Sequence, residues 1–154
     1  TMLHAVFDSL GEAVGADLCF SYLVTPGEPD ILTLVASRGL GPEERARFAR
    51  LRIGERLCGL VAERRERIIL VDVQGCPMPE AEAMRAAGAT CYAGFPLIAH
   101  GRLVGTVAFA MRTRPCFAES EIEAIGLVAD QAAAITERRA LHDALVESAE
   151  QLAS

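Results

Sequence analysis

Five cysteines and three histidines are the residues of this chain best suited to nucleophilic, acid–base or metal chemistry. The cysteines are scattered and form no CxxC pair, so a structural zinc site is not expected. Their odd number and the absence of a signal peptide predict free thiols in a reducing, cytoplasmic compartment. A thiol nucleophile needs a base beside it, yet His4, His100 and His142 fall on a predicted helix, a hairpin tip and a distant helix. The sequence therefore predicts no catalytic residue and no bound metal.

The composition is that of one folded, acidic domain. Of the 154 residues, 51% are apolar and 23% are charged, and the formal net charge is −6; such a chain is long enough to bury a core. The densest basic stretch, residues 45–67, is interleaved with glutamates and is typical of a solvated helix face. We expect no nucleic-acid partner, because no basic stripe can neutralise phosphates, and no membrane span, because the apolar runs are too short.

Apolar residues recur with helical and with strand period along the chain. Turn signals rich in glycine and proline separate these segments, the strongest being residues 26–30. The expected elements are, in order, a helix at 3–14, strands at 18–24 and 31–37, short helices from 42 and from 54, a strand at 68–73, a small helix ending at 87, strands at 91–99 and 103–111, and a helix from 119 to the end. Strand pairs joined by hairpins predict an antiparallel sheet with helices on its faces, an α+β plan.

The strand at 103–111 has one bulky and one small face. The bulky face carries Leu103, Val107, Phe109 and Met111; the small face carries Val104, Thr106, Ala108 and Ala110. The last helix offers alanines at 129, 132, 133 and 134. We expect the small face to pack closely against this helix, which turns the bulky face toward any pocket; the alternative is a void beneath the small face, which is costly.

Several stretches of the chain resemble a GAF domain. The closing half of that family is matched by YAGFPL at 92–97, HGRLVG at 100–105 and PCFAESE at 115–121. Its middle is matched by GERLCGLVA at 54–62 and ILVDV at 69–73. Each stretch is common by itself, but their order and spacing are specific to the family. The chain is therefore identified as a GAF domain over residues 1–140, with residues 141–154 extending a C-terminal signalling helix.

The resemblance implies a central antiparallel sheet of five or six strands, with the N- and C-terminal helices on one face and short helices and loops over a pocket on the other. It also implies a non-catalytic regulatory module of a signalling protein, such as a two-component sensor histidine kinase, which carries an output domain. By fold analogy the ligand pocket would be lined by Cys58, Asp72, Cys91, Tyr92 and Phe95. Alternatively each is structural, with Asp72 as a loop cap and the aromatic side chains as core.

The residue types leave the ligand, and any cofactor, unknown. Family members that attach a bilin use a cysteine followed by histidine, whereas Cys91 is followed by Tyr92, and no histidine is placed to ligate a haem. The family's cyclic-nucleotide residue set is also missing. One branch of the family reduces free methionine-(R)-sulfoxide with paired cysteines. Because Cys76 and Cys91 flank the lid-like segment, such a reductase is the alternative function, and a domain used only for protein contacts is a third.

The C-terminal helix carries a stripe with alternating gaps of four and three residues, typical of a coiled coil. Its members are Ala134, Arg138, Leu141, Leu145, Ser148 and Leu152. Exposed Leu141, Leu145 and Leu152 would need a parallel partner helix for burial. The stripe predicts a homodimer through the terminal helices; the alternative is a floppy tail that packs only in a crystal.

Overall fold

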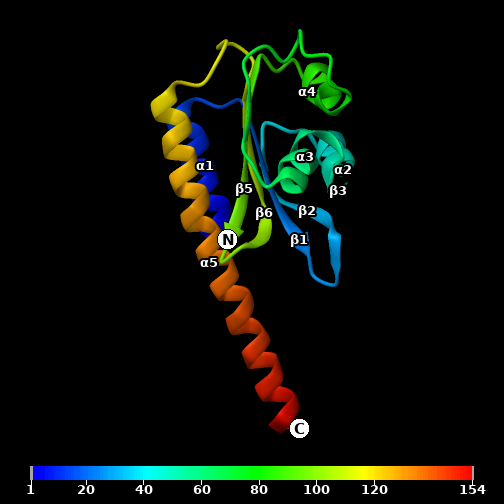
Figure 1. Ribbon diagram of the computed structural model, residues 1–154, viewed down its shortest axis with the longest axis vertical. Coiled ribbons are helices and arrows are strands. Elements are labelled where there is room, and N and C mark those ends of the chain that lie inside the picture. Colours follow the sequence, from blue (N-terminus) through cyan, green and yellow to red (C-terminus); the bar gives the residue numbers. More distant parts are fainter. Residues whose placement is uncertain (1, 154) are drawn as a thin grey trace.

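A six-stranded antiparallel sheet with strand order β3-β2-β1-β6-β5-β4 forms the centre of the computed structural model, which describes residues 2–153. Helices α1 and α5 lie on one side of the sheet, and α2, α3 and α4 lie on the other (Figure 1). The elements are α1 (Met2–Val14), β1 (Leu18–Thr25), β2 (Glu28–Arg38), α2 (Pro42–Phe48), β3 (Arg50–Arg52), α3 (Arg56–Arg64), β4 (Ile68–Leu70), the 3-10 helix η1 (Pro79–Ala81), α4 (Glu82–Ala86), β5 (Cys91–Ala99), β6 (Arg102–Met111) and α5 (Glu119–Ala153). The expected α+β class and helix placement are confirmed.

One strand and two boundaries differ from those expected. Strand β3 is not among the expected elements; it has only three residues, too few for an alternating pattern to be visible in the sequence. The first hairpin turns through Pro26 and Gly27 alone, because Glu28 already pairs with Thr25. Charged residues made the start of β2 look like a loop, but this part of the strand is exposed and tolerates them. Strand β4 ends at Leu70, so the predicted strand at 68–73 is too long.

The β5–β6 hairpin has the tight turn that the sequence predicts. His100 and Gly101 both have positive φ, 51° and 74°, as a type I′ turn requires. The strands pair from Cys91↔Met111 to Ala99↔Arg102, with one irregularity after Leu97. Strand β6 also pairs with β1, so this hairpin occupies the middle of the sheet and connects its two halves.

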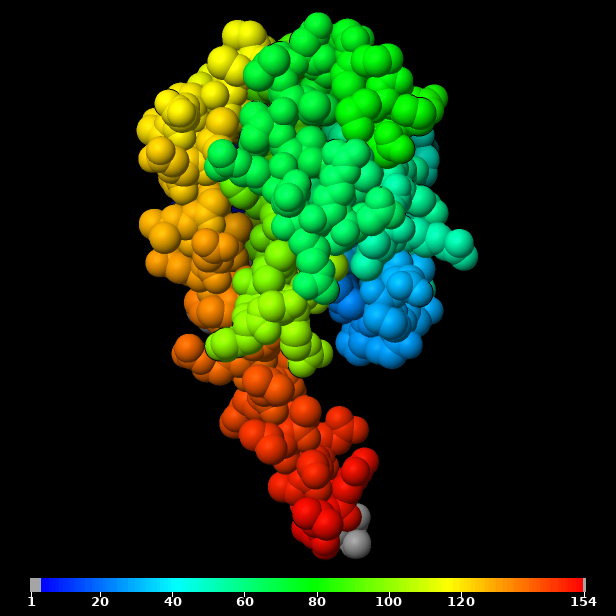
Figure 2. Space-filling model, viewed as in Figure 1, coloured from blue at the N-terminus to red at the C-terminus, as the bar shows by residue number. Residues whose placement is uncertain are grey.

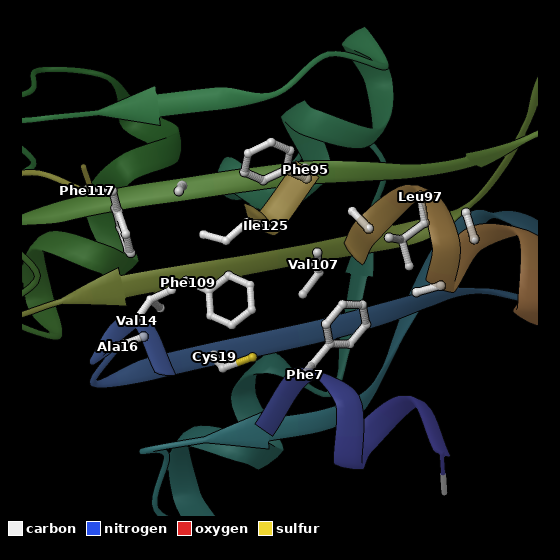
Figure 3. Close-up of a cluster of buried hydrophobic side chains, with 14 of the residues drawn as sticks. Phe7, Val14, Ala16, Cys19, Phe95, Leu97, Val107, Phe109, Phe117 and Ile125 are labelled. Carbon is white, nitrogen blue, oxygen red and sulfur yellow. The ribbon is translucent and has the colours of Figure 1, made fainter. Parts of the chain in front are cut away.

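The expected facing of β6 is wrong for Val107, Phe109 and Met111, which face the terminal helices. Leu103, opposite the irregularity after Leu97, packs on the cavity side as expected. Figure 3 shows Val107 and Phe109 on the side of Ile125 and Phe7, and the rings of Phe7 and Phe109 meet edge-on at 6.5 Å. Met111 joins the same buried cluster, which includes the alanines 129, 132 and 133 of α5. Small helix residues leave room that large strand residues fill, because a close-packed interior favours complementary volumes.

The small face of β6 lies in a second cluster, under α2, α3 and α4. Ala108 and Ala110 are fully buried there among larger side chains of β1 and β5, including Phe20, Tyr22 and Tyr92. Ala108 pairs directly with Phe20 across the sheet. The missing volume on β6 is thus filled by aromatic rings from its neighbouring strands, and it is α3, not the expected α5, that approaches this face.

Helix α5 is continuous over 35 residues and has two parts. Its first part packs on the sheet through Ile125, Ala129, Ala132 and Ala133, and Glu137 is its last buried residue. Residues 138–153 are exposed, and Figure 2 shows this part standing clear of the domain body. None of the helices between residues 2 and 153 is long and apolar enough to cross a membrane.

Replacing Phe109 tests its burial in the cluster beneath the terminal helices. We expect Phe109→Ala to lower the free energy of unfolding by about 3–5 kcal/mol, because it empties a fully buried site beneath α1 and α5. Val35→Ala, at a position 47% exposed on β2, is the control and should change it by about 0.5 kcal/mol or less. Urea unfolding measures both, and a Phe109→Ala loss no larger than that of the control would contradict the burial of Phe109.

Candidate ligand cavity

A small cavity lies between the sheet and helices α2, α3 and α4. Its volume is about 20 Å³, room for a single water molecule. The lining is mostly aromatic and aliphatic and comes from β1, β3, β5 and the three short helices. It consists of Phe20, Tyr22, Phe48, Leu51, Arg56, Leu57, Cys58, Glu80, Ala83, Met84 and Tyr92.

Two tyrosines form the floor of this cavity, and each has its hydroxyl satisfied. Tyr22 donates to the carbonyl oxygen of Phe48 at 2.8 Å, and the hydroxyl of Tyr92 lies 3.3 Å from the Sγ of Cys58. Gly94 makes room for Tyr92, since a Cβ at Gly94 would lie 2.6 Å from the tyrosine oxygen. Burial raises the pKa of both phenols, so the floor is neutral.

Arg56 and Phe48 form the opposite wall. The Arg56 guanidinium carbon lies 4.6 Å from the centre of the Phe48 ring, a cation–π arrangement. The Nη1 of Arg56 is buried and has no hydrogen-bond partner. The backbone of Arg56 has φ +56°, a left-handed conformation that is strained for a residue with a side chain. The local structure therefore holds a cationic side chain inside a largely apolar cavity.

A larger hollow of about 360 Å³ lies outside this wall. Phe48, Arg56 and Ala83 line both the inner cavity and the outer hollow, so they separate the two spaces. The outer hollow adds charged side chains, Glu44, Arg47 and Glu82 among them. A molecule in the outer hollow would therefore contact the Arg56–Phe48 wall first.

The sequence-predicted pocket residues divide between two faces of the sheet. Cys58 and Tyr92 line the cavity. Cys91 and Phe95 lie in the cluster beneath the terminal helices, because residues one or three apart on a strand point to opposite faces. Asp72 is exposed and accepts a hydrogen bond from the backbone N–H of Gly75 at 3.1 Å, which caps the turn after β4.

The sequence analysis missed Arg56 and Glu80. Arg56 belongs to the arginine-rich stretch that was interpreted as a solvated helix face, and that interpretation is wrong for this residue. The sequence signal that could have indicated Arg56 is Gly54 two residues before it, because a glycine there marks the irregular backbone at the start of α3. Composition alone did not reveal that the side chain at this point turns inward.

The cysteines are all free thiols. Cys91 is buried on the helix side of the sheet, whereas Cys76 packs against the cavity-side cluster. Burial raises the pKa of Cys19 to about 12 and of Cys58 to about 11, and it also raises the pKa of Cys91. Such thiols are protonated near neutral pH and are poor nucleophiles. Between residues 2 and 153, no three histidine, cysteine or acidic side chains are grouped to hold a metal ion.

An open antiparallel sheet with terminal helices on one face, and a cavity under short helices on the other, is the GAF fold. The chain belongs to the GAF domain family: the family model matches residues 1–137. None of the curated proteins matches the chain.

Solved structures of several functional kinds share the fold. The GAF domain of a phosphoenolpyruvate-protein phosphotransferase from Coxiella burnetii is 31% identical, with a TM-score of 0.74, over 92% of this chain and 84% of that one. A domain of a putative two-component sensor histidine kinase from Sinorhizobium meliloti is 24% identical, with a TM-score of 0.69, over 89% of each chain. A free methionine-R-sulfoxide reductase from Neisseria meningitidis, solved with its substrate, is 22% identical, with a TM-score of 0.71, over 90% of this chain and 78% of that one.

Proposed function

We propose that this chain is a regulatory GAF domain that binds a small molecule in the cavity beside Arg56 and relays its occupancy to an output domain through α5. The observation that carries this proposal is a series of contacts from the cavity to that helix. The domain has no catalytic activity of its own in this proposal, and its cytoplasmic location remains an expectation from its thiols.

The series of contacts runs from α3 through the β5–β6 turn to α5. Helix α3 supplies Cys58 to the cavity, and Arg65 at its end donates from Nη1 to the carbonyl oxygen of Gly101 at 2.7 Å. The neighbouring His100 donates from Nδ1 to the Oε1 of Glu137 at 2.6 Å. Glu137 is the last buried residue of α5 before the helix leaves the domain. A shift of α3 would therefore be felt at the base of the exit helix.

The related structures support a regulatory setting. The 31% identical neighbour is a domain of a phosphotransferase, and another is a domain of a putative histidine kinase. In both cases the domain is named as part of a larger protein. The comparison supports a proposed output domain of one class, an enzyme of phosphoryl transfer, of which the histidine kinase is one kind.

The relay can be tested without knowing the ligand. Ala83→Phe fills the space between the inner cavity and the outer hollow and acts as a built-in occupant. We expect it to change the hydrogen exchange of residues 138–153, and we expect His100→Ala to abolish that change. The corresponding coupling energy should be about 0.5–2 kcal/mol.

Arg102→Ala is the control for this cycle, because Arg102 is an exposed residue of the same hairpin. It should leave the effect of Ala83→Phe intact. Additive effects of Ala83→Phe and His100→Ala would remove the basis for the relay.

The absence of catalysis is tested against the reductase alternative. Because Cys91 and Cys76 pack on opposite sides of the sheet, we expect no thioredoxin- and NADPH-coupled reduction of free methionine sulfoxide. Wild type and Cys91→Ser should both give the background rate. Turnover in the wild type that disappears in Cys91→Ser would establish the enzyme instead.

Homodimerisation through α5 is part of the proposal. Leu141, Leu145 and Leu152 are 52%, 70% and 87% exposed, and together they form an apolar stripe along the projecting helix. An apolar groove of about 510 Å³ that includes Val6 and Ile135 adjoins the base of this helix. A second copy of the chain would bury the stripe in a parallel coiled coil.

Sedimentation measures this dimer. We expect the wild type to be dimeric at micromolar concentrations and Leu145→Glu to be monomeric, because a charge would then lie in the seam. Val146→Glu is the matched control, one residue away and off the stripe, and it should remain dimeric. A wild-type monomer at high micromolar concentration would contradict the proposal.

A further inference from the structure

Arg56 and Glu80 are two opposite charges that line one cavity. Among the described residues, ion pairs join Arg38 to Asp8, Arg50 to Glu28 and Arg114 to Glu121, and His100 contacts Glu137. Neither Arg56 nor Glu80 takes part in them, although both line the inner cavity. Burying a charged group without a partner is costly. This cost applies to the buried Nη1 of Arg56, and a ligand that supplies an acceptor would remove it. Glu80 is half-buried and offers an opposite charge in the same lining.

The geometry of Arg56 suits a carboxylate. Its Nη1 is buried and has no acceptor in the protein, while its guanidinium carbon lies over the Phe48 ring. A planar guanidinium with free N–H groups binds a carboxylate through two parallel hydrogen bonds. The left-handed backbone of Arg56 directs this side chain to the wall between the two spaces.

The surrounding charges disfavour a polyanion. Glu80 lines the inner cavity, and Glu44 and Glu82 line the outer hollow. Against these three carboxylates stand only Arg56 and Arg47. A phosphate or a dicarboxylate would face more negative than positive charge, whereas a molecule with one carboxylate and one ammonium matches both unpaired groups.

The remaining lining sets the size and polarity of the ligand body. Phe20, Phe48 and Met84 make the inner cavity apolar. The outer hollow, at about 360 Å³, is at the low end of the range of about 300–1,000 Å³ that small-molecule pockets occupy. The ligand is therefore small, with a short apolar group directed past the Phe48 ring.

From these observations, and resting on the proposed function, we infer that the cavity binds a free α-amino acid with an apolar side chain. Arg56 binds the carboxylate and Glu80 binds the ammonium group. Binding replaces the Arg56–Phe48 stack with an ion pair and lets the Phe48 ring turn away, which opens the inner cavity to the ligand side chain.

Calorimetric titration of the whole chain with leucine, methionine and phenylalanine, each with its deaminated and decarboxylated analogue, tests the inference. We expect at least one amino acid to bind, and both of its analogues to bind about tenfold or more weakly, since each lacks one charged contact. Arg56→Met should weaken the binding of that amino acid by about tenfold or more. Arg64→Met is the matched control, an exposed arginine on the same helix, and should bind as the wild type does.

Glu80→Gln separates the two contacts. It should lower the affinity for the amino acid but leave the affinity for the deaminated analogue unchanged, because that analogue has no ammonium group. Neither variant loses an ion pair, but Arg56→Met loses the contact of the guanidinium with the Phe48 ring; thermal melting of each variant checks that it is folded. Equal binding by Arg56→Met and wild type, or no binding of any of the three amino acids, would overturn the inference.

A wider metabolite screen on wild type and Ala83→Phe separates this inference from the proposed function. A neutral or anionic metabolite that stabilises the wild type and not Ala83→Phe would leave the cavity as the ligand site and show the amino-acid assignment to be wrong. If no compound binds and the cavity and hairpin variants are additive, the proposed function fails as well.

Discussion

Strand β6 carries large side chains on one face and small ones on the other, and both layers of the domain are built on this division of volume. Val107, Phe109 and Met111 fill the space left by the alanines of α5. Ala108 and Ala110, on the reverse face, leave space that the aromatic rings of β1 and β5 fill. Because interiors are packed to crystal density, exchanging these faces would separate α5 from the sheet and crowd Tyr22 and Tyr92. The position of the exit helix and the floor of the cavity therefore depend on the same strand.

The β5–β6 hairpin joins these two layers mechanically. Its strands separate the cavity from α5, and its turn contacts both sides, through Arg65 from α3 and Glu137 from α5. His100 is 86% exposed at this turn and yet makes a contact of 2.6 Å with a nearly buried carboxylate. This polar contact lies at the edge of the core, so it can be rearranged without opening the hydrophobic cluster. The Oε2 of Glu137 is buried and has no partner, so loss of the His100 contact would be costly for the carboxylate. In the proposed relay, a small movement of the turn therefore changes a contact on which α5 depends.

The sequence predicted the elements and their order well, since glycine and proline mark most boundaries and the strand period is clear in β5 and β6. It did not predict which face of β6 meets α5, because alanines on a helix are compatible with either small or large residues opposite them; only the summed volumes decide. Grouping Tyr92 with Phe95 ignored the period of two, which places them on opposite faces. Arg56 was hidden because it lies in a stretch of the chain that is rich in arginine. Its inward direction comes from a positive φ that no residue type there indicates.

A ligand can shift an equilibrium between two conformations only as far as its affinities for them differ. The proposed relay therefore requires that the contacts of the cavity differ between the empty and the occupied domain. The Arg56–Phe48 wall is a contact that would differ in this way. In the closed cavity of about 20 Å³, the guanidinium has the ring as partner and one nitrogen without an acceptor. An anionic group that satisfies this nitrogen must displace the ring or move the beginning of α3. Helix α3 has only nine residues, and Arg65 at its end donates to the hairpin turn. In the proposed relay, a movement of its first residue would therefore reach the turn as a rigid-body shift, and the unsatisfied nitrogen would be the feature through which binding energy reaches α5.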